Sequence, residues 1–177
     1  FRFDLSKGFT QFNSGSDASL MSRYDASRIA ILKDYGNLVK SQNPNAYVIL
    51  EHFADNAEEK ELSESGFLLW GNMNYNFNQA SMGYGSNDLN ASLAVKRGWS
   101  KNHLISYMES HDEERLNFKN LQYGNGTGNY NIKQLNTAID RQKLVHLFYL
   151  LMPGPKMIWQ NGEVGYDYSI NHCIDGT

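Results

Sequence analysis

The sequence lacks several features that define whole classes of protein. It has one cysteine, Cys173, which cannot form a disulfide within the chain, so cysteine usage says little about the compartment. No apolar run approaches the ~20 residues of a membrane-spanning helix. The net charge is only −3 and the charges are scattered, which argues against nucleic acid or an anionic lipid surface as a partner. There is also no glycine-rich phosphate-binding motif, so nothing predicts a nucleotide site.

What is present is an ordinary globular composition with two unusual features. Hydrophobic residues make up 41% of the 177 residues, which is enough for one domain or part of one. Aromatic residues reach 13% and asparagine is abundant, a mixture that suits a sugar-binding surface, although most single aromatics lie in cores. The chain also opens on Phe1 to Leu5, already inside a strand-like alternation. We therefore expect it to be a piece of a longer protein.

Short apolar runs alternate with segments of helical period, which predicts βα units and a mostly parallel sheet. The predicted strands are Phe1 to Leu5, Tyr47 to Phe53, Phe67 to Trp70, His103 to Met108 and Lys156 to Gln160. The predicted helices are Ser22 to Gln42, Asn56 to Glu64, Asp88 to Lys96 and Ile132 to Leu151. We expect a short strand or an ordered loop over Asn72 to Gln79, and a surface loop over Lys119 to Asn131.

Five βα units predict the α/β class and part of a (β/α)₈ barrel. A whole barrel takes ~250 residues, so this chain has the length for about five of the eight units. The alternative architecture is an open, doubly wound sheet.

Three acidic residues lie at or just past the ends of three predicted strands: Asp4, Glu51 and Asp112. In parallel barrels such positions face the mouth of the active site, where a charge is hard to explain by packing. One solvated acid at a strand end would mean little, but three on separate strands indicate a function.

Side-chain alternation predicts which residues share a face with these acids. Arg2 and Asp4 share one face of the first strand, and Phe3 lies on the other, toward the helices. The guanidinium of Arg2 favours the ionised form of Asp4, which a carboxylate nucleophile requires. If Asp4 and Glu51 end adjacent strands, their carboxyl groups come within the ~5–5.5 Å of a retaining glycosidase.

The same residues carry a resemblance to a known family. Phe1 to Gly8 resembles the fourth-strand motif of the alpha-amylase superfamily (glycoside hydrolase family thirteen), written G-F-R-x-D-x-x-K. Leu50 to Phe53 resembles the fifth-strand motif, and Ser110 to Arg115 resembles the seventh-strand motif with its His-Asp pair. Gly162-Glu163 is similar to the eighth-strand ending. The motifs come in family order and span nearly the whole chain.

The resemblance implies that residues 1–177 are the C-terminal portion of a TIM-barrel catalytic domain, about strands four to eight, in a retaining enzyme that acts on α-linked glucans. It implies that Asp4 is the nucleophile, Glu51 the general acid/base, and Asp112 the carboxylate that stabilises the oxocarbenium-like sugar. The substrate-binding residues that it implies are Arg2, Lys7, His111 and Arg115.

Some features depart from the family pattern. Gly8 replaces a common histidine, and Ser110 replaces the commoner asparagine. The resemblance places the third-strand motif, the first three strands and the excursion domain before residue 1. The family's calcium site draws on those parts, so we predict neither calcium nor another cofactor here. The family often works as secreted or periplasmic enzymes.

Three alternatives stay open. The first is a debranching, branching or transglycosylating relative with the same carboxylates. The second is a non-catalytic sugar-binding or interaction homologue, or an inactive fragment. The third is a metal-dependent hydrolase that uses His52, Glu51, His111 and Asp112, against which the alternation of neighbouring side chains on a strand argues.

Five strands cannot close an eight-stranded barrel, so two sheet edges would stay open. Open edges recruit further strands, and we predict that the chain associates with another copy or with a larger assembly. Light scattering at high concentration tests this prediction, and a clean monomer would contradict it.

Overall fold

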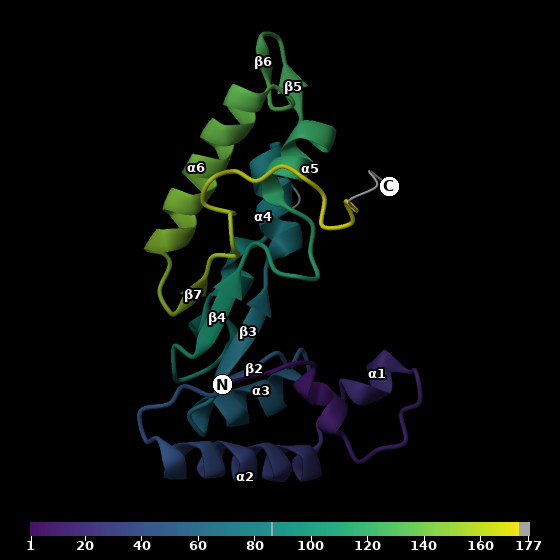
Figure 1. Ribbon diagram of the computed structural model, residues 1–177, viewed down its shortest axis with the longest axis vertical. Coiled ribbons are helices and arrows are strands. Elements are labelled where there is room, and N and C mark those ends of the chain that lie inside the picture. The colour runs from purple at the N-terminus through teal and green to yellow at the C-terminus, as the bar shows by residue number, and fades with distance from the viewer. Residues whose placement is uncertain (86, 174–177) are drawn as a thin grey trace. The chain divides into compact units, whose positions relative to one another are not determined.

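The computed structural model describes residues 1–85 and 87–173, and these residues form an α/β fold (Figure 1). A five-stranded parallel sheet has the order β1-β2-β3-β4-β7, and β5 and β6 form a separate antiparallel pair. The strands are β1 (Arg2–Phe3), β2 (Ile49–Leu50), β3 (Leu68–Asn72), β4 (Leu104–Tyr107), β5 (Gly126–Thr127), β6 (Tyr130–Asn131) and β7 (Lys156–Met157). The α/β class and the parallel sheet are therefore as predicted.

Helices follow the strands along the chain. They are α1 (Ala18–Met21), α2 (Ala26–Gln42), α3 (Asn56–Glu64), α4 (Asn74–Met82), α5 (Leu116–Tyr123) and α6 (Leu135–Leu151). Short 3₁₀ turns lie at Ser6–Phe9, Leu89–Ser92 and Ala94–Arg97. In the part of the chain that the structure describes, no helix has both the length and the apolar character needed to cross a membrane.

The chain divides into two compact units. The first consists of Phe1–Gly71 and Leu93–Ile105, and the second of Asn72–Ser92 and the chain from Ser106 onward. Both β3 and β4 contribute residues to each unit.

In the first unit, α2 and α3 cover one face of the strands (Figure 1). Parallel pairing places Arg2 opposite Ile49, and Ile49 opposite Leu68. The core between strands and helices contains Ile29, Leu32, Val48, Leu50, Leu62, Phe67, Leu69, Ala94, Trp99 and Leu104. Burial of each leucine or isoleucine side chain stabilises the fold by roughly 1.5–3 kcal/mol.

Aspartate caps decide where the two long helices of this unit begin. The Asp25 carboxylate accepts hydrogen bonds from the backbone N–H groups of Ser27 (3.0 Å) and Arg28 (3.2 Å). Helix α2 therefore begins at Ala26, later than the predicted start at Ser22. Asp55 caps α3 in the same way, and the range predicted for α3 is confirmed.

In the second unit, α4, α5 and α6 pack on one another beside the β4–β7 pair. Its core contains Met73, Phe77, Met108, Leu116, Val145 and Tyr149. The Tyr149 hydroxyl donates to the carbonyl of Ser106 and accepts a hydrogen bond from the N–H of Met157 (3.0 Å). One side chain of α6 therefore holds β4 and β7 together.

The structure corrects the prediction for Asn72 to Gln79, which belongs largely to helix α4. Met73, Phe77 and Ser81 are all buried and recur every four residues, which is a helical period rather than a strand alternation. The Asn74 side chain donates to the carbonyls of Met108 (2.8 Å) and Glu114 (2.8 Å). Its amide is thus a tertiary anchor and not a turn signal.

The predicted loop at Lys119 to Asn131 was also wrong. It holds the end of α5 and the β5–β6 hairpin, whose turn contains Gly128 at a φ of 58°. Asn120 on α5 is buried and donates to the Ser81 hydroxyl (2.7 Å), a partner that local sequence does not indicate.

Three further boundaries differ from the prediction. Asp88 does cap a turn, accepting from the N–H of Asn90 (2.9 Å), but the extended backbone at Leu93 divides the predicted helix into two 3₁₀ turns. Helix α6 begins at Leu135 rather than Ile132. The strands β1, β2 and β7 are shorter than predicted, at two residues each.

Close packing of α2 on Phe67 generates a prediction for Gly36. A Cβ atom at Gly36 would lie 2.5 Å from Cζ of the buried Phe67 ring. We expect Gly36→Ala to lower the free energy of unfolding by about 1–3 kcal/mol, despite the better helix propensity of alanine. Urea unfolding followed by circular dichroism measures the difference.

Gly8→Ala is the matched control, because a Cβ atom at Gly8 meets no atom within 4 Å. We expect it to change the stability by less than about 0.5 kcal/mol. Equal stability of the two variants would contradict the prediction, because it would show that α2 and the Phe67 ring can move apart without a loss of free energy of unfolding.

Candidate active site

Two of the predicted acids lie side by side in the first unit. Asp4 directly follows β1, and Glu51 directly follows β2, its parallel neighbour. The N–H of Glu51 donates to the carbonyl of Phe3 (3.0 Å), and the N–H of Ser6 donates to the carbonyl of Glu51 (2.7 Å). These backbone bonds continue the pairing of the two strands past both acids.

One guanidinium joins the two carboxylates. Nη2 of Arg2 lies 2.7 Å from Oδ1 of Asp4 and also contacts Oε2 of Glu51. A carboxylate oxygen of Asp4 lies within 4.8 Å of one of Glu51. The carboxyl groups of retaining glycosidases are ~5–5.5 Å apart, and this pair is compatible with that spacing.

The two carboxylates differ in exposure. The Asp4 side chain is 68% exposed, whereas the Glu51 side chain is 7% exposed. The Arg2 guanidinium lies over the buried ring of Trp70, 4.2 Å from its centroid. The ring fixes one face of the guanidinium and leaves its edge to the carboxylates.

The predicted alternation of faces is confirmed on both strands. Phe3 stacks on Tyr35 of α2 with ring centroids 6.0 Å apart. Leu50 belongs to the core beneath the helices, and His52 bonds Glu58 of α3 (2.8 Å). Arg2 and Glu51 therefore lie on the face away from the helices, and His52 turns away from Glu51.

Unusual backbone conformations follow three of the strands. Among the described residues, the non-glycine residues with positive φ are Leu5 (41°), Phe53 (50°) and Asn161 (63°). Leu5 comes directly after Asp4, and Phe53 comes two residues after Glu51. Each such conformation costs on the order of 1–3 kcal/mol, and such strain concentrates at functional sites.

Lys7 lies in the 3₁₀ turn after β1 and is half-buried. Its ammonium group lies 3.3 Å from the Ser22 hydroxyl and 3.5 Å from the carbonyl of Phe53. These contacts hold the Lys7 side chain near the turn that follows Glu51.

The second unit carries the other predicted acid and its neighbours. Asp112 follows β4, with its side chain 62% exposed, and its N–H donates to the Ser110 hydroxyl (3.1 Å). Nε2 of His111 lies 3.5 Å from Oδ2 of Asp112, and the His111 ring lies 5.8 Å from the ring of Trp159. Asp112 and His111 are thus adjacent and accessible.

The Arg115 side chain is buried, unlike the accessible side chains of His111 and Asp112. Its Nη1 donates to the carbonyl of Gln160 (2.9 Å) and lies 3.5 Å from Glu109, and its guanidinium lies 5.1 Å from the ring of Tyr166. These contacts tie the segment after β4 to the segment after β7, so Arg115 supports the loops.

The sequence did not indicate the buried polar residues that bond to the segments after β4 and β2. Burial raises the pKa of Glu109, which accepts from the N–H of Leu116 (2.7 Å). A Cβ atom at Gly162 would lie 2.5 Å from Oε2 of Glu109, which explains the glycine of the last motif. In the first unit, Arg28 and Glu58 form a buried pair that no local pattern indicated.

Four large aromatic side chains of the kind that can stack on a sugar ring, Trp70, Tyr75, Tyr84 and Trp99, divide into two groups by burial. Trp70 and Trp99 are buried, and the indole N–H of Trp99 donates to Asn56 (3.0 Å). Tyr75 is 62% exposed and Tyr84 is 40% exposed. Trp70 and Trp99 therefore pack in the core, whereas Tyr75 and Tyr84 are accessible to solvent.

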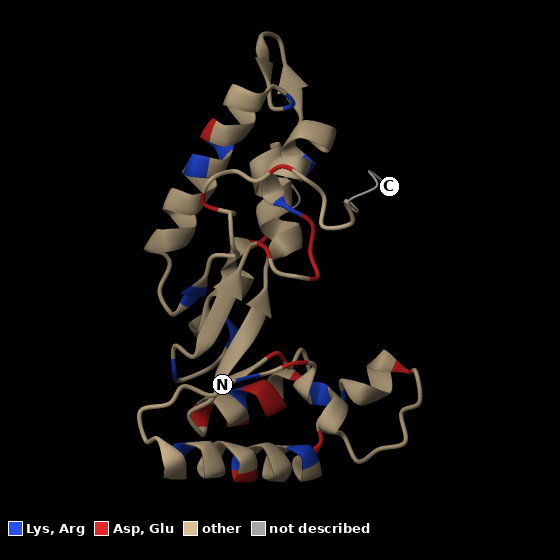
Figure 2. Ribbon diagram, in the orientation of Figure 1, with Lys and Arg blue, Asp and Glu red and all other residues tan. Residues whose placement is uncertain are grey.

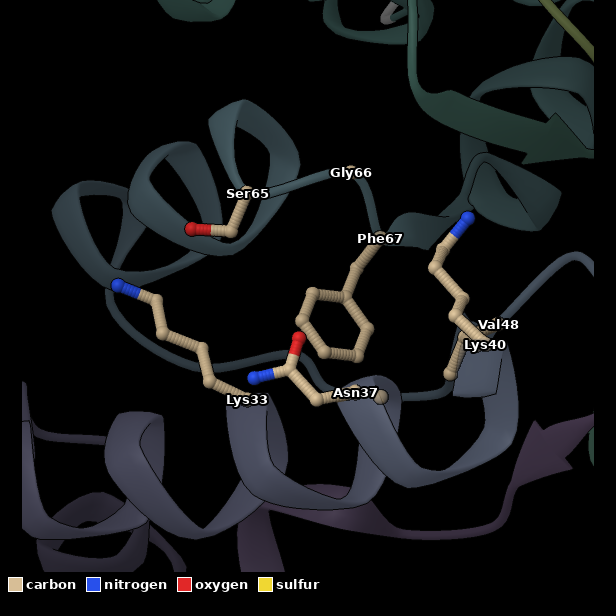
Figure 3. Close-up of a pocket in the computed structure, with 8 residues that line it drawn as sticks. Lys33, Asn37, Lys40, Val48, Ser65, Gly66 and Phe67 are labelled. Carbon is tan, nitrogen blue, oxygen red and sulfur yellow. The ribbon is translucent and has the colours of Figure 1, made fainter. Parts of the chain in front are cut away.

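A cavity of about 130 Å³ in the first unit lies on the helix side of β2 (Figure 3). Figure 3 shows Asn37 and the Phe67 ring near its centre, with Lys33 and Lys40 at its margins. Val48 lines it and belongs to the face opposite Glu51. Its lining contains Lys33 and Lys40 but no acidic residue, and Lys33 is paired with Glu61 (2.7 Å).

No family model matches the sequence, and no curated protein matches it either.

The electrostatics of α3 give a prediction about pH. Burial raises the pKa of Glu59 to about 7, although Arg97 (3.2 Å) opposes the shift. A folded-state pKa above the ordinary 4.5 means that the folded state binds more protons between pH 4.5 and 7. Stability is therefore greatest below about pH 4.5 on this account and falls by roughly 3 kcal/mol as the pH rises to 7.

Glu59→Gln removes this titration. Urea unfolding measures the free energy of unfolding of both proteins at pH 5 and at pH 8. We expect the decrease between these two pH values to be about 2–3 kcal/mol larger in the wild type than in the variant. Asp25 and Glu58, whose pKa values are lowered, have the opposite slope but are present in both proteins and cancel. Glu64→Gln, at an exposed position of the same helix, serves as the control, and parallel curves for wild type and Glu59→Gln would refute the prediction.

Proposed function

We propose that this chain is the catalytic part of a retaining glycoside hydrolase that acts on α-linked glucans such as starch and maltooligosaccharides. The observation that carries the proposal is the pair Asp4 and Glu51, which end adjacent parallel strands and share the guanidinium of Arg2. A pair of carboxyl groups at this spacing is the essential apparatus of the double-displacement mechanism.

The two acids have different tasks in this mechanism. The exposed Asp4 carboxylate attacks the anomeric carbon, and Glu51 gives its proton to the departing glycosidic oxygen. A covalent glycosyl-Asp4 forms as the glycosidic bond breaks. Glu51 then takes a proton from water, which attacks the same carbon and releases Asp4. Arg2 orients both carboxylates through its contact with each of them.

The remaining roles come from the resemblance to the alpha-amylase superfamily. Asp112 stabilises the distorted, oxocarbenium-like sugar, and His111 hydrogen-bonds the same sugar. Lys7 contacts a neighbouring sugar. Arg115 acts by holding the loops after β4 and β7, in keeping with its buried contacts. The mechanism uses only side chains of the chain, and we propose no metal or other cofactor.

The finer fold assignment is part of the proposal. We propose that the five parallel strands are strands four to eight of a (β/α)₈ barrel. Supporting it are the parallel order along the sheet and the acids directly after β1 and β2, where barrel enzymes carry their catalytic residues. An open doubly wound sheet remains the alternative architecture.

Related functions share this apparatus. A debranching, branching or transglycosylating enzyme would use the same carboxylates, and product analysis on linear and branched glucans separates these activities. A non-catalytic sugar-binding homologue is disfavoured because such proteins typically lose at least one carboxylate, and all three are present here.

Self-association also belongs to the proposal. β1 and β7 are the outermost strands of the sheet. Figure 2 shows charged positions in the N-terminal half of α6 and few in its C-terminal half. That half exposes Leu144, Leu147, Phe148, Leu150 and Leu151. An apolar surface of this kind marks a protein–protein contact, and a second copy of the chain is the partner that we propose.

Paired substitutions test the division of roles. We expect Asp4→Asn to reduce kcat by about 10³-fold or more on both maltooligosaccharides and α-glucosyl fluoride, because the nucleophile is lost for every substrate. We expect Glu51→Gln to lose about 10²–10⁴-fold on maltooligosaccharides but far less on the fluoride, whose leaving group needs little protonation. Reducing-end release and fluoride release are the two measurements.

Asp34→Asn, which removes an exposed carboxylate from α2, is the control and should keep full activity. The proposal fails if Asp4→Asn matches the wild-type chain, or if Glu51→Gln loses the two activities equally.

A further inference from the structure

A continuous chain of buried polar contacts runs behind the two acids. The Ser6 hydroxyl lies 2.9 Å from Nδ1 of His52 and 2.9 Å from the carbonyl oxygen of Glu51. Nε2 of His52 lies 2.8 Å from Oε1 of Glu58. Glu58 in turn binds Arg28 through two contacts of 2.7 Å each. Ser6, His52, Glu58 and Arg28 are all 0% exposed.

At the end of these contacts that is farthest from Glu51, Arg28 and Glu58 also bond to backbone groups. Arg28 donates to the carbonyls of Lys7 (2.8 Å), Met21 (2.7 Å) and Arg23 (2.9 Å). The N–H of Asp25 donates to Oε2 of Glu58 (2.9 Å). These bonds leave the guanidinium and the carboxylate little freedom to move.

The protonation states of His52 and Glu58 decide which group donates and which accepts in each of these hydrogen bonds. Burial lowers the pKa of His52, although its hydrogen bond to Glu58 opposes this shift. Burial would raise the pKa of Glu58, but hydrogen bonds from His52 and Arg28 outweigh it, so that this pKa is lowered. Neutral His52 therefore donates from Nε2 to the Glu58 carboxylate and presents Nδ1 as an acceptor to the Ser6 hydroxyl, which also donates to the carbonyl of Glu51. The N–H of Ser6 remains the donor to the carbonyl of Glu51 (2.7 Å).

Two members of this network, Ser6 and His52, lie close in sequence to the proposed catalytic residues. Ser6 is separated from Asp4 only by Leu5, whose φ of 41° is strained, and His52 is the residue after Glu51. The contact between Ser6 and His52 thus joins the two strand ends on the helix side. Arg2 joins the two carboxylates on the opposite side.

We infer that Ser6, His52, Glu58 and Arg28 form a positioning network that fixes the separation of the Asp4 and Glu51 carboxylates. The inference rests on the proposed function of those two residues. Stability alone is a weak account of the network, because a buried ion pair commonly adds no more stability than well-packed apolar side chains. A fully hydrogen-bonded polar network specifies one arrangement of the groups that it joins.

Ser6→Ala tests the network with little disturbance of packing, because it removes the hydroxyl and adds no atom. Its control is Ser41→Ala, which removes a hydroxyl bonded to the carbonyl of Leu38 (2.7 Å) on the exposed face of α2. Amide hydrogen exchange is measured residue by residue on the whole chain. We expect the N–H groups of Ser6 and Glu51 to exchange about tenfold faster in Ser6→Ala, while the amides in the middle of α2 keep their wild-type rates.

A second variant guards against misfolding of the first. His52→Gln keeps a polar group where Nε2 bonds Glu58 but loses the acceptor for Ser6, so the same local acceleration is expected. No change at Ser6 and Glu51 in either folded variant overturns the inference. A uniform acceleration across all amides also overturns it, because that result indicates a general loss of stability.

Kinetics separate this inference from the proposed function. Misplacement of reacting groups lowers kcat, so we expect Ser6→Ala to lose about tenfold or more in kcat with less than a twofold change in KM. If the local exchange effect is present but Asp4→Asn and the wild type have equal activity, the proposed function fails, and the inference, which rests on it, fails as well. If Asp4→Asn abolishes activity but Ser6→Ala alters neither exchange nor kcat, the function stands and the network has no positioning role.

Discussion

The ion pair between Arg28 and Glu58 is the interaction on which the first unit depends. Neither side chain is exposed, so each charge relies on the other and on the backbone groups around it. Removal of one partner would leave an uncompensated buried charge, at a cost of about 3–5 kcal/mol. The pair joins α2 to α3, and its bonds reach the turn after β1 and the histidine after β2. The strand ends that carry Asp4 and Glu51 are therefore held by the same contacts that join the helices. Figure 2 shows acidic positions on α3, the helix that carries Glu58.

Much of the local arrangement of the first unit was predictable from the sequence. Side-chain alternation along the two longer strands that the sequence predicted correctly separated Phe3 and Leu50, which face the helices, from Arg2 and Glu51, which face away from them. The α3 range was correct because Asp55 is a strong cap. Helix α4 was missed because its asparagines, which ordinarily signal turns, bond carbonyls that are distant in the sequence. Such partners exist only after the chain has folded.

In the candidate site too, some features were predictable from the sequence and others were not. The positions of Asp4, Glu51 and Asp112 after their strands follow from the sequence pattern, and Arg2 was expected beside Asp4, whereas its contact with Glu51 was not. The buried supports were not predictable, because Arg28 and Glu58 are 30 residues apart and Glu109 receives its bond from Leu116. A charged residue is normally assigned to the surface, and only its partner reveals that it is buried. Arg115 illustrates the point, since its motif position suggested a sugar contact but its guanidinium holds a backbone carbonyl after β7.

The three tryptophans of the chain occupy different environments. Trp70 lies beneath the Arg2 guanidinium, Trp99 bonds Asn56 and lies near Arg97, and Trp159 adjoins His111 in the second unit. Indole emission depends on neighbouring charge and on solvent access. The chain therefore carries its own fluorophores, with one beside the shared guanidinium and one beside the histidine of the other unit. Single-tryptophan versions of the protein would report on each region optically without any attached label.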